Sequence, residues 1–160
     1  MRIVQKFWAW YERHYTLNVT LVSSLFLIQL VHLYWMATNV VALRLFGQSY
    51  FHVTPFWRIV IALVDYTEIP AIIATSLFYI HEIIREFSWK SLGLLLFINS
   101  QWLHLFWITD EIIIAQFTGQ IPILLPAWLL WIAILIDYLE LPVIYDILRR
   151  FGRRIVPRAF

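Results

Sequence analysis

Six ionisable side chains inside apolar stretches are the residues of this sequence best suited to chemistry. They are two histidines and four carboxylates: His32, Asp65, Glu68, His104, Asp137 and Glu140. Mixed nitrogen and oxygen ligands suit Fe, Mn or Zn. Ferritin-like four-helix proteins hold two metal ions with the same set of groups, although there each His follows a Glu on the same helix. Since here the His lies on another segment, the likeness is one of chemistry only. We expect the six residues to bind two divalent metal ions.

The six residues belong to two motifs that each occur twice. Residues 29–35 and 101–107 share the pattern Gln-x-x-His-Leu-aromatic-Trp. Residues 65–70 and 137–142 share the pattern Asp-Tyr-x-Glu-x-Pro. The second motif follows the first at the same distance in both copies, so that every residue of one copy has a counterpart at a constant offset in the other. This spacing predicts an internal repeat of two equivalent halves.

The six ionisable side chains, here called the polar layer, also allow three interpretations other than a metal site. Its side chains could pair across helices and only hold the helices together. They could form a path for protons or cations without a fixed cofactor. His32 and His104 could also bind haem b from opposite sides, although the four nearby carboxylates argue against haem.

Four further residues lie beside the predicted ligands. Gln29 and Gln101 are one helical turn from the histidines and are expected to orient the imidazoles. Tyr66 and Tyr138 adjoin the aspartates and are expected to donate hydrogen bonds or to serve redox chemistry. Simple packing or interhelical hydrogen bonding is the alternative for all four.

A second group lies about two helical turns beyond each histidine, towards the outer face. It comprises Asn39 in the first copy and Asp110 and Glu111 in the second. Because of this spacing, Asn39 and Glu111 lie on the same helix face as the histidines. We expect this group to line an access path, the alternative being an ordinary helix end.

The elements that position these residues are expected to be transmembrane helices. The chain has 160 residues, of which 62% are hydrophobic and only 14% charged, and its mean hydropathy is +0.75. No Asp, Glu, Lys or Arg occurs between residues 15 and 43, a run longer than the ~20 residues needed to cross a bilayer. The absence of cysteine excludes disulfides and thiolate metal sites. We predict an interfacial helix over 1–14, four spans near 16–44, 56–80, 91–116 and 125–147, and a basic tail over 148–160.

The repeat and the basic residues together predict the topology. Repeat one (16–80) and repeat two (91–147) each hold two spans, so the fold class is an all-α integral membrane protein, a four-helix bundle of parallel-repeat hairpins with pseudo-twofold symmetry. Ten basic residues lie on one side of the spans and two on the other, which puts both termini in the cytoplasm. Such a chain fits the plasma membrane of a prokaryote. Asp65 and Asp137 then lie about 15 Å deep, near the middle of the bilayer.

The favoured function is an integral membrane metalloprotein with a dinuclear metal site. As an enzyme, it would be an oxidoreductase or hydrolase that acts on a lipid-soluble substrate such as a quinone, isoprenoid or acyl chain. One alternative is a divalent-cation or proton-coupled transporter, which with four spans would need a homodimer. The other is a non-catalytic assembly subunit. The lipid bilayer is the expected partner, and no nucleic acid is expected.

Overall fold

The computed structural model describes residues 2–50, 54–109 and 126–155 of the chain. These residues contain no strand, which confirms the prediction of an all-helical protein. The helices are α1 (Arg2–Arg13), α2 (Tyr15–Trp35), the π-helix η1 (Met36–Val41), α3 (Ala42–Phe46), α4 (Pro55–Tyr66), α5 (Glu68–Arg85), α6 (Trp89–Ile108), α8 (Ala127–Tyr138) and α9 (Glu140–Ile155).

Three helical stretches are long and apolar enough to cross a membrane. They are Tyr15–Phe46, Ile59–Arg85 and Trp128–Arg153. These stretches indicate an integral membrane protein. Helix α6 covers the first part of the predicted third span, 91–116, and the last part of that span lies outside the described residues. The count of four spans therefore stays a prediction.

Two helix breaks divide the stretches that carry the acidic motifs. A single residue, Thr67, separates α4 from α5, and Leu139 separates α8 from α9. Pro70 and Pro142 explain both breaks, because proline has no N–H and its ring collides with the carbonyl four residues earlier. The amides of Thr67 and Leu139 donate to the carbonyls three residues earlier, at 2.9 and 3.0 Å, as in a tightened turn. Each break lies between the Asp and the Glu of its motif.

Two helices extend further than the sequence predicts. Helix α5 continues to Arg85, so the connection to α6 is only residues 86–88 rather than the whole charged segment 81–90. Helix α9 continues to Ile155, so the first half of the predicted basic tail is helical. Arginine is a good helix former and is favoured near a helix C-terminus, which explains the extension.

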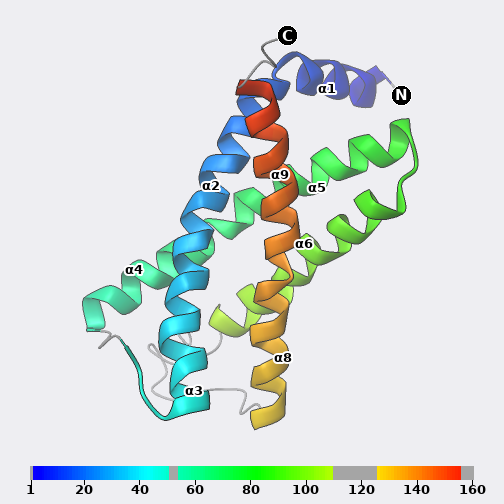
Figure 1. The fold of residues 1–160 in the computed structure, drawn as a ribbon. Coiled ribbons are helices and arrows are strands. Elements are labelled where there is room, and N and C mark those ends of the chain that lie inside the picture. The colour runs from blue at the N-terminus through cyan, green and yellow to red at the C-terminus, as the bar shows by residue number, and fades with distance from the viewer. Residues whose placement is uncertain (1, 51–53, 110–125, 156–160) are drawn as a thin grey trace.

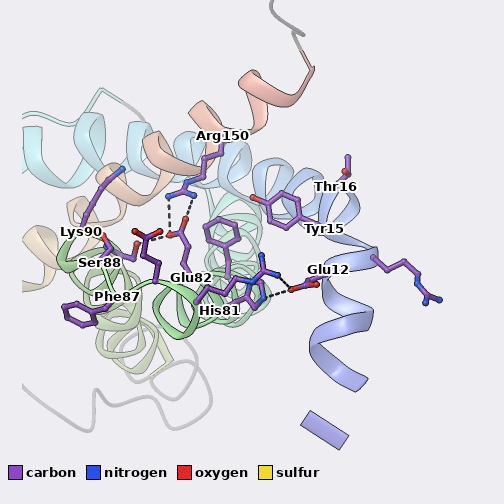
Figure 2. A pocket seen from close by; sticks show the side chains of 14 residues that line it. Glu12, Tyr15, Thr16, His81, Glu82, Phe87, Ser88, Lys90 and Arg150 are labelled. Atoms are coloured by element: carbon purple, nitrogen blue, oxygen red, sulfur yellow. Dashed lines mark hydrogen bonds and ion pairs between the residues drawn. The ribbon is translucent and has the colours of Figure 1, made fainter. Parts of the chain in front are cut away.

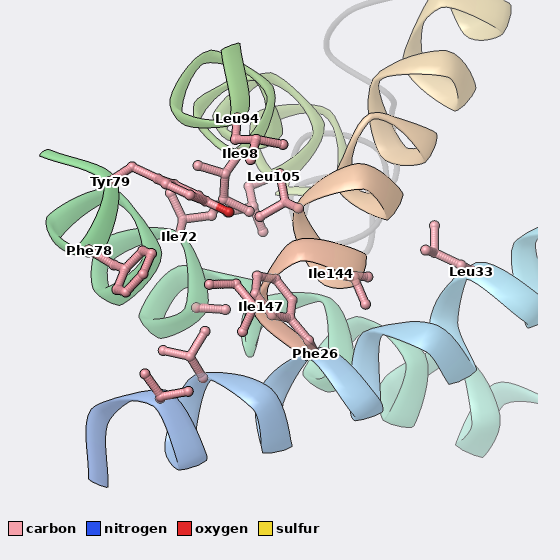
Figure 3. Packing of buried hydrophobic residues seen from close by; sticks show 14 of the residues in the cluster. Phe26, Leu33, Ile72, Phe78, Tyr79, Leu94, Ile98, Leu105, Ile144 and Ile147 are labelled. Atoms are coloured by element: carbon pink, nitrogen blue, oxygen red, sulfur yellow. The ribbon is translucent and has the colours of Figure 1, made fainter. Parts of the chain in front are cut away.

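The helices form two pairs that cross one another (Figure 1). Helix α2 runs beside α9 in the opposite direction, and α5 runs beside α6 in the opposite direction. Helix α2 also contacts α4 and α5, and α6 also contacts α8 and α9. The fully buried side chains where the pairs meet form a hydrophobic core, which includes Phe26, Ile72, Tyr79, Ile98 and Ile147 (Figure 3). The polar layer lies along the same helices.

The N-terminal helix α1 packs across one end of the molecule (Figure 1). Its Tyr11 is buried, and burial, followed by the influence of Tyr15, raises the pKa of this phenol to about 12. Glu12 lies 2.6 Å from a guanidinium nitrogen of Arg85 and 3.1 Å from Nε2 of His81. These contacts fix α1 to the end of α5, as a helix separate from the first span.

Candidate metal centre

Four of the predicted ligands meet at one place, and each comes from a different helix. His32 lies on α2, Asp65 on α4, His104 on α6 and Asp137 on α8. Nδ1 of His32 is 2.5 Å from Oδ1 of Asp65. Nδ1 of His104 contacts Oδ1 of Asp137 in the same way, at the corresponding positions of the second motif copy. The same pair of groups therefore forms the same contact in each half of the sequence.

Asp137 joins the two histidines. Besides its contact with His104, its Oδ2 lies 3.8 Å from Nε2 of His32. The two imidazole rings lie 5.8 Å apart between centroids. One nitrogen from each ring and one Asp137 oxygen lie within 4.8 Å of one another. Ligands of a tetrahedral Zn²⁺ lie roughly 3.4 Å apart at bond lengths near 2.0–2.1 Å, so a shift of about an ångström would let these three bind one ion.

All six predicted ligands are buried. The most exposed is His104, at 8%, and the four carboxylates are each 3% exposed or less. A buried charge is stable only when it is paired, protonated or bound to a metal. Four acids against two imidazoles leave an excess of negative charge, which a divalent cation would offset.

Glu68 and Glu140 form a second acidic pair next to this cluster. They are the first residues of α5 and α9, directly after the two helix breaks. Glu68 lies within electrostatic range of Glu140, Asp65, Asp137 and His32. Oε2 of Glu68 and Oε1 of Glu140 have no hydrogen-bond partner among the described residues. The structure thus brings the two glutamates near the cluster. They are not among the three residues, His32, His104 and Asp137, whose ligand atoms lie within 4.8 Å of one another.

The residues present fit a metal ion. Nε2 of His104 is buried and has no hydrogen-bond partner among the described residues, so it has a free ligand position. The donor set of imidazole nitrogen and carboxylate oxygen is the one that Fe, Mn and Zn accept. The His/Asp cluster could therefore bind a metal.

The two glutamines donate hydrogen bonds to backbone carbonyls. Nε2 of Gln29 donates to the carbonyl of Val64 at 3.0 Å, and Nε2 of Gln101 donates to the carbonyl of Ile136 at 2.8 Å. These carbonyls belong to the residues directly before Asp65 and Asp137. The amides thus hold the backbone that carries the aspartates, which is the interhelical hydrogen bonding expected as the alternative, and the orientation of the imidazoles by these residues stays a prediction.

The two tyrosines beside the aspartates have other contacts. The Tyr66 hydroxyl bonds to the Thr109 hydroxyl at 2.7 Å, at the end of α6. Tyr138 is partly buried against the hydrophobic core. Neither forms a hydrogen bond to an aspartate among the described residues, so the expected roles of the two tyrosines stay predictions.

The predicted access path is described only in part. Asn39 lies in η1, where its side-chain oxygen accepts a hydrogen bond from the hydroxyl of Ser49. Asp110 and Glu111 lie outside the described residues, so their part in the path stays a prediction.

A cavity of about 200 Å³ borders the cluster. Its walls are mostly apolar, and they come from α2, η1, α4, α6 and α8 together with Arg44 of α3. The lining residues are His32, Trp35, Met36, Val40, Arg44, Ile61, Asp65, His104, Trp107, Leu130, Ala133, Ile134 and Asp137. The cluster is thus reached from a partly open space with mostly apolar walls.

A polar network at the opposite end of the helices does not follow from the sequence motifs. It borders a larger cavity of about 890 Å³ between α1, α5, α6 and α9 (Figure 2). There Arg150 contacts Glu82 at 2.5 Å and Asp146 at 2.7 Å, and Lys90 contacts Asp146 at 2.5 Å. Asp146 and Arg150 are one helical turn apart in the sequence, and this spacing could have predicted their contact. Because acids and bases here neutralise each other, the network explains how charged residues are held at this end of the spans.

Comparison with protein-family models, with curated proteins and with solved structures finds no match to this chain. The geometry of the polar layer is therefore the basis for assigning a function.

Proposed function

We propose that the chain is an integral membrane metalloprotein with a dinuclear centre inside a bundle of four spans. His32, His104 and Asp137 would hold one ion, with Asp65 against His32. Glu68 and Glu140 would hold a second ion beside it. The observation that carries the proposal is the contact of one buried carboxylate, Asp137, with both histidines.

Several paired contacts support two equivalent halves. The His–Asp contact, the Gln–carbonyl hydrogen bond and the helix break each occur twice, at matching positions of the two motif copies. Two hairpins related by an axis along the membrane normal would place these features opposite each other. We propose that arrangement as the fold, with both termini on the cytoplasmic side where the basic residues gather.

The unpartnered polar atoms favour a metal centre over simple interhelical pairing. Side chains that only join helices should satisfy one another, because an unpaired buried polar group costs about 1–3 kcal/mol. Here buried oxygens of Glu68 and Glu140 and Nε2 of His104 have no hydrogen-bond partner among the described residues. Bound cations would occupy all three atoms.

The cavity beside the cluster favours an enzyme acting on a lipid-soluble substrate. Its apolar walls would bind such a molecule and exclude bulk water. The metal ions would supply Lewis-acid or redox chemistry when bound. The two aspartates would hold the imidazole nitrogens in place, and the two glutamines would hold the aspartates.

Metal analysis of the purified protein tests the proposal. We expect about two ions of Fe, Mn or Zn per chain, as in other carboxylate–histidine bundles, and no Soret band. His104→Ala should lose at least one ion and Glu140→Ala the second, with helicity retained by circular dichroism. His81→Ala, a histidine at the other end of the bundle, is the matched control and should keep both. Wild-type protein without stoichiometric metal, after growth and purification in metal-supplemented buffer, would sink the proposal.

A further inference from the structure

The cavity beside the cluster also reaches a charged residue outside it. It is lined by His32 on α2 and by Arg44 on α3, which belong to the same helical stretch. Its volume is about 200 Å³. The cavity thus joins the buried cluster to an exposed arginine.

The volume fits a short chain. At about 30 Å³ for a group the size of a water molecule, the cavity holds roughly seven such groups. Trp35 and Trp107, the matching residues of the two sequence motifs, both line it, as do Val40 and Ile134. Their side chains present apolar surface to the cavity. A methylene chain would be compatible with these walls.

Three polar groups of the cavity have no partner among the residues that the structure describes. Arg44 is exposed and forms no ion pair with any residue that the structure describes. The indole Nε1 of Trp35 is buried without a hydrogen-bond partner in the described chain, and so is Nε2 of His104. His104 is more than nine-tenths buried. An indole N–H and a guanidinium are both donors, so the matching ligand carries acceptor oxygens, and the fixed charge of arginine favours an anionic group.

We propose that this cavity binds a lipid-soluble monocarboxylate of the acyl-chain type. Its carboxylate would pair with Arg44 and accept a hydrogen bond from Trp35, and its chain would extend towards His104. The assignment of this molecule as a substrate rests on the proposed metal centre. The binding itself does not, because none of the groups that hold the carboxylate is a metal ligand.

Binding of octanoate to detergent-solubilised protein, stripped of metal with a chelator, tests the site. Isothermal titration should show wild-type binding that Arg44→Gln weakens about 10- to 100-fold, the range of a lost charge-assisted contact. Trp35→Phe should weaken it by a smaller factor. Ala133→Phe, which fills the cavity, should abolish it. Arg85→Gln removes an exposed arginine at the other end and should leave it unchanged.

Octanol separates recognition of the carboxylate from binding of the chain. It should bind wild type and Arg44→Gln with equal affinity, and more weakly than octanoate binds wild type. Equal octanoate affinity in wild type and Arg44→Gln, or binding that survives Ala133→Phe, would overturn the inference. Because the protein is metal-free throughout, octanoate binding with the expected losses would stand even if the wild-type protein proved to hold no metal. Metal-loaded protein that binds no octanoate would refute this inference and leave the metal centre intact.

Discussion

Replacement of Asp137 by asparagine is the sharpest test of the centre, because this carboxylate contacts both histidines while Asp65 contacts one. Asparagine keeps the size of the side chain and removes its charge. Loss of a carboxylate that orients a ligating histidine typically weakens metal binding about 10- to 100-fold. Asp137→Asn affects both histidines and should raise the metal Kd by roughly 10²- to 10⁴-fold. Asp65→Asn affects one histidine and should raise it by roughly 10- to 100-fold.

The assay is competition for Zn²⁺ or Mn²⁺ between purified protein and a fluorescent chelator, with helicity followed by circular dichroism. Asp146→Asn is the matched control, because Asp146 is also buried but contacts Lys90 and Arg150 at the other end of the bundle. Its metal affinity should equal that of wild type. Equal losses in Asp65→Asn and Asp137→Asn would refute the reasoning, since it depends on Asp137 serving both histidines.

Three further outcomes are expected. Gln101→Leu should lower the free energy of unfolding by about 0.5–1.5 kcal/mol, because the carbonyl of Ile136 loses its hydrogen bond from another helix while it keeps the one from the amide of Leu139; denaturation in detergent measures it, and a loss no larger than that of Ser100→Ala, whose hydroxyl bonds within its own helix, would contradict it. Ile98→Ala should destabilise by about 2–5 kcal/mol, because Ile98 is fully buried; the same assay checks this, and exposed Leu96→Ala should change little. Pro142→Ala should let α8 and α9 join into one helix, move Glu140 and reduce bound metal, as elemental analysis would show; unchanged metal content would argue against the break positioning that residue.

The sequence was informative about which residues meet, because a charge inside an apolar helix has few possible partners. Burial of Asp65 and Asp137 and their contacts with the histidines follow from the need of each charge for a partner. The breaks at Thr67 and Leu139 follow from proline geometry. Such constraints are local or act on single groups, so they can be predicted without coordinates.

The sequence was less informative where several partners satisfy the same group. Gln29 and Gln101 could bond to an imidazole or to a backbone carbonyl within the same reach, and only the packing of the helices decides for the carbonyl. The ion pair between Arg150 and Glu82 joins residues far apart in the sequence, so helical spacing does not predict it. The cavity beside Arg44 depends on how several helices fit together, which no periodicity encodes.

The helix breaks also place two helix starts in the interior of the protein. Glu68 and Glu140 are the first residues of α5 and α9, but Thr67 and Leu139 keep a right-handed helical backbone, so α4 and α8 end directly in front of them. The negative end of each preceding helix then offsets the positive start of the next helix. The acidic pair therefore gains little from the helix dipoles, and the proposed metal ions would have to supply most of the neutralising charge.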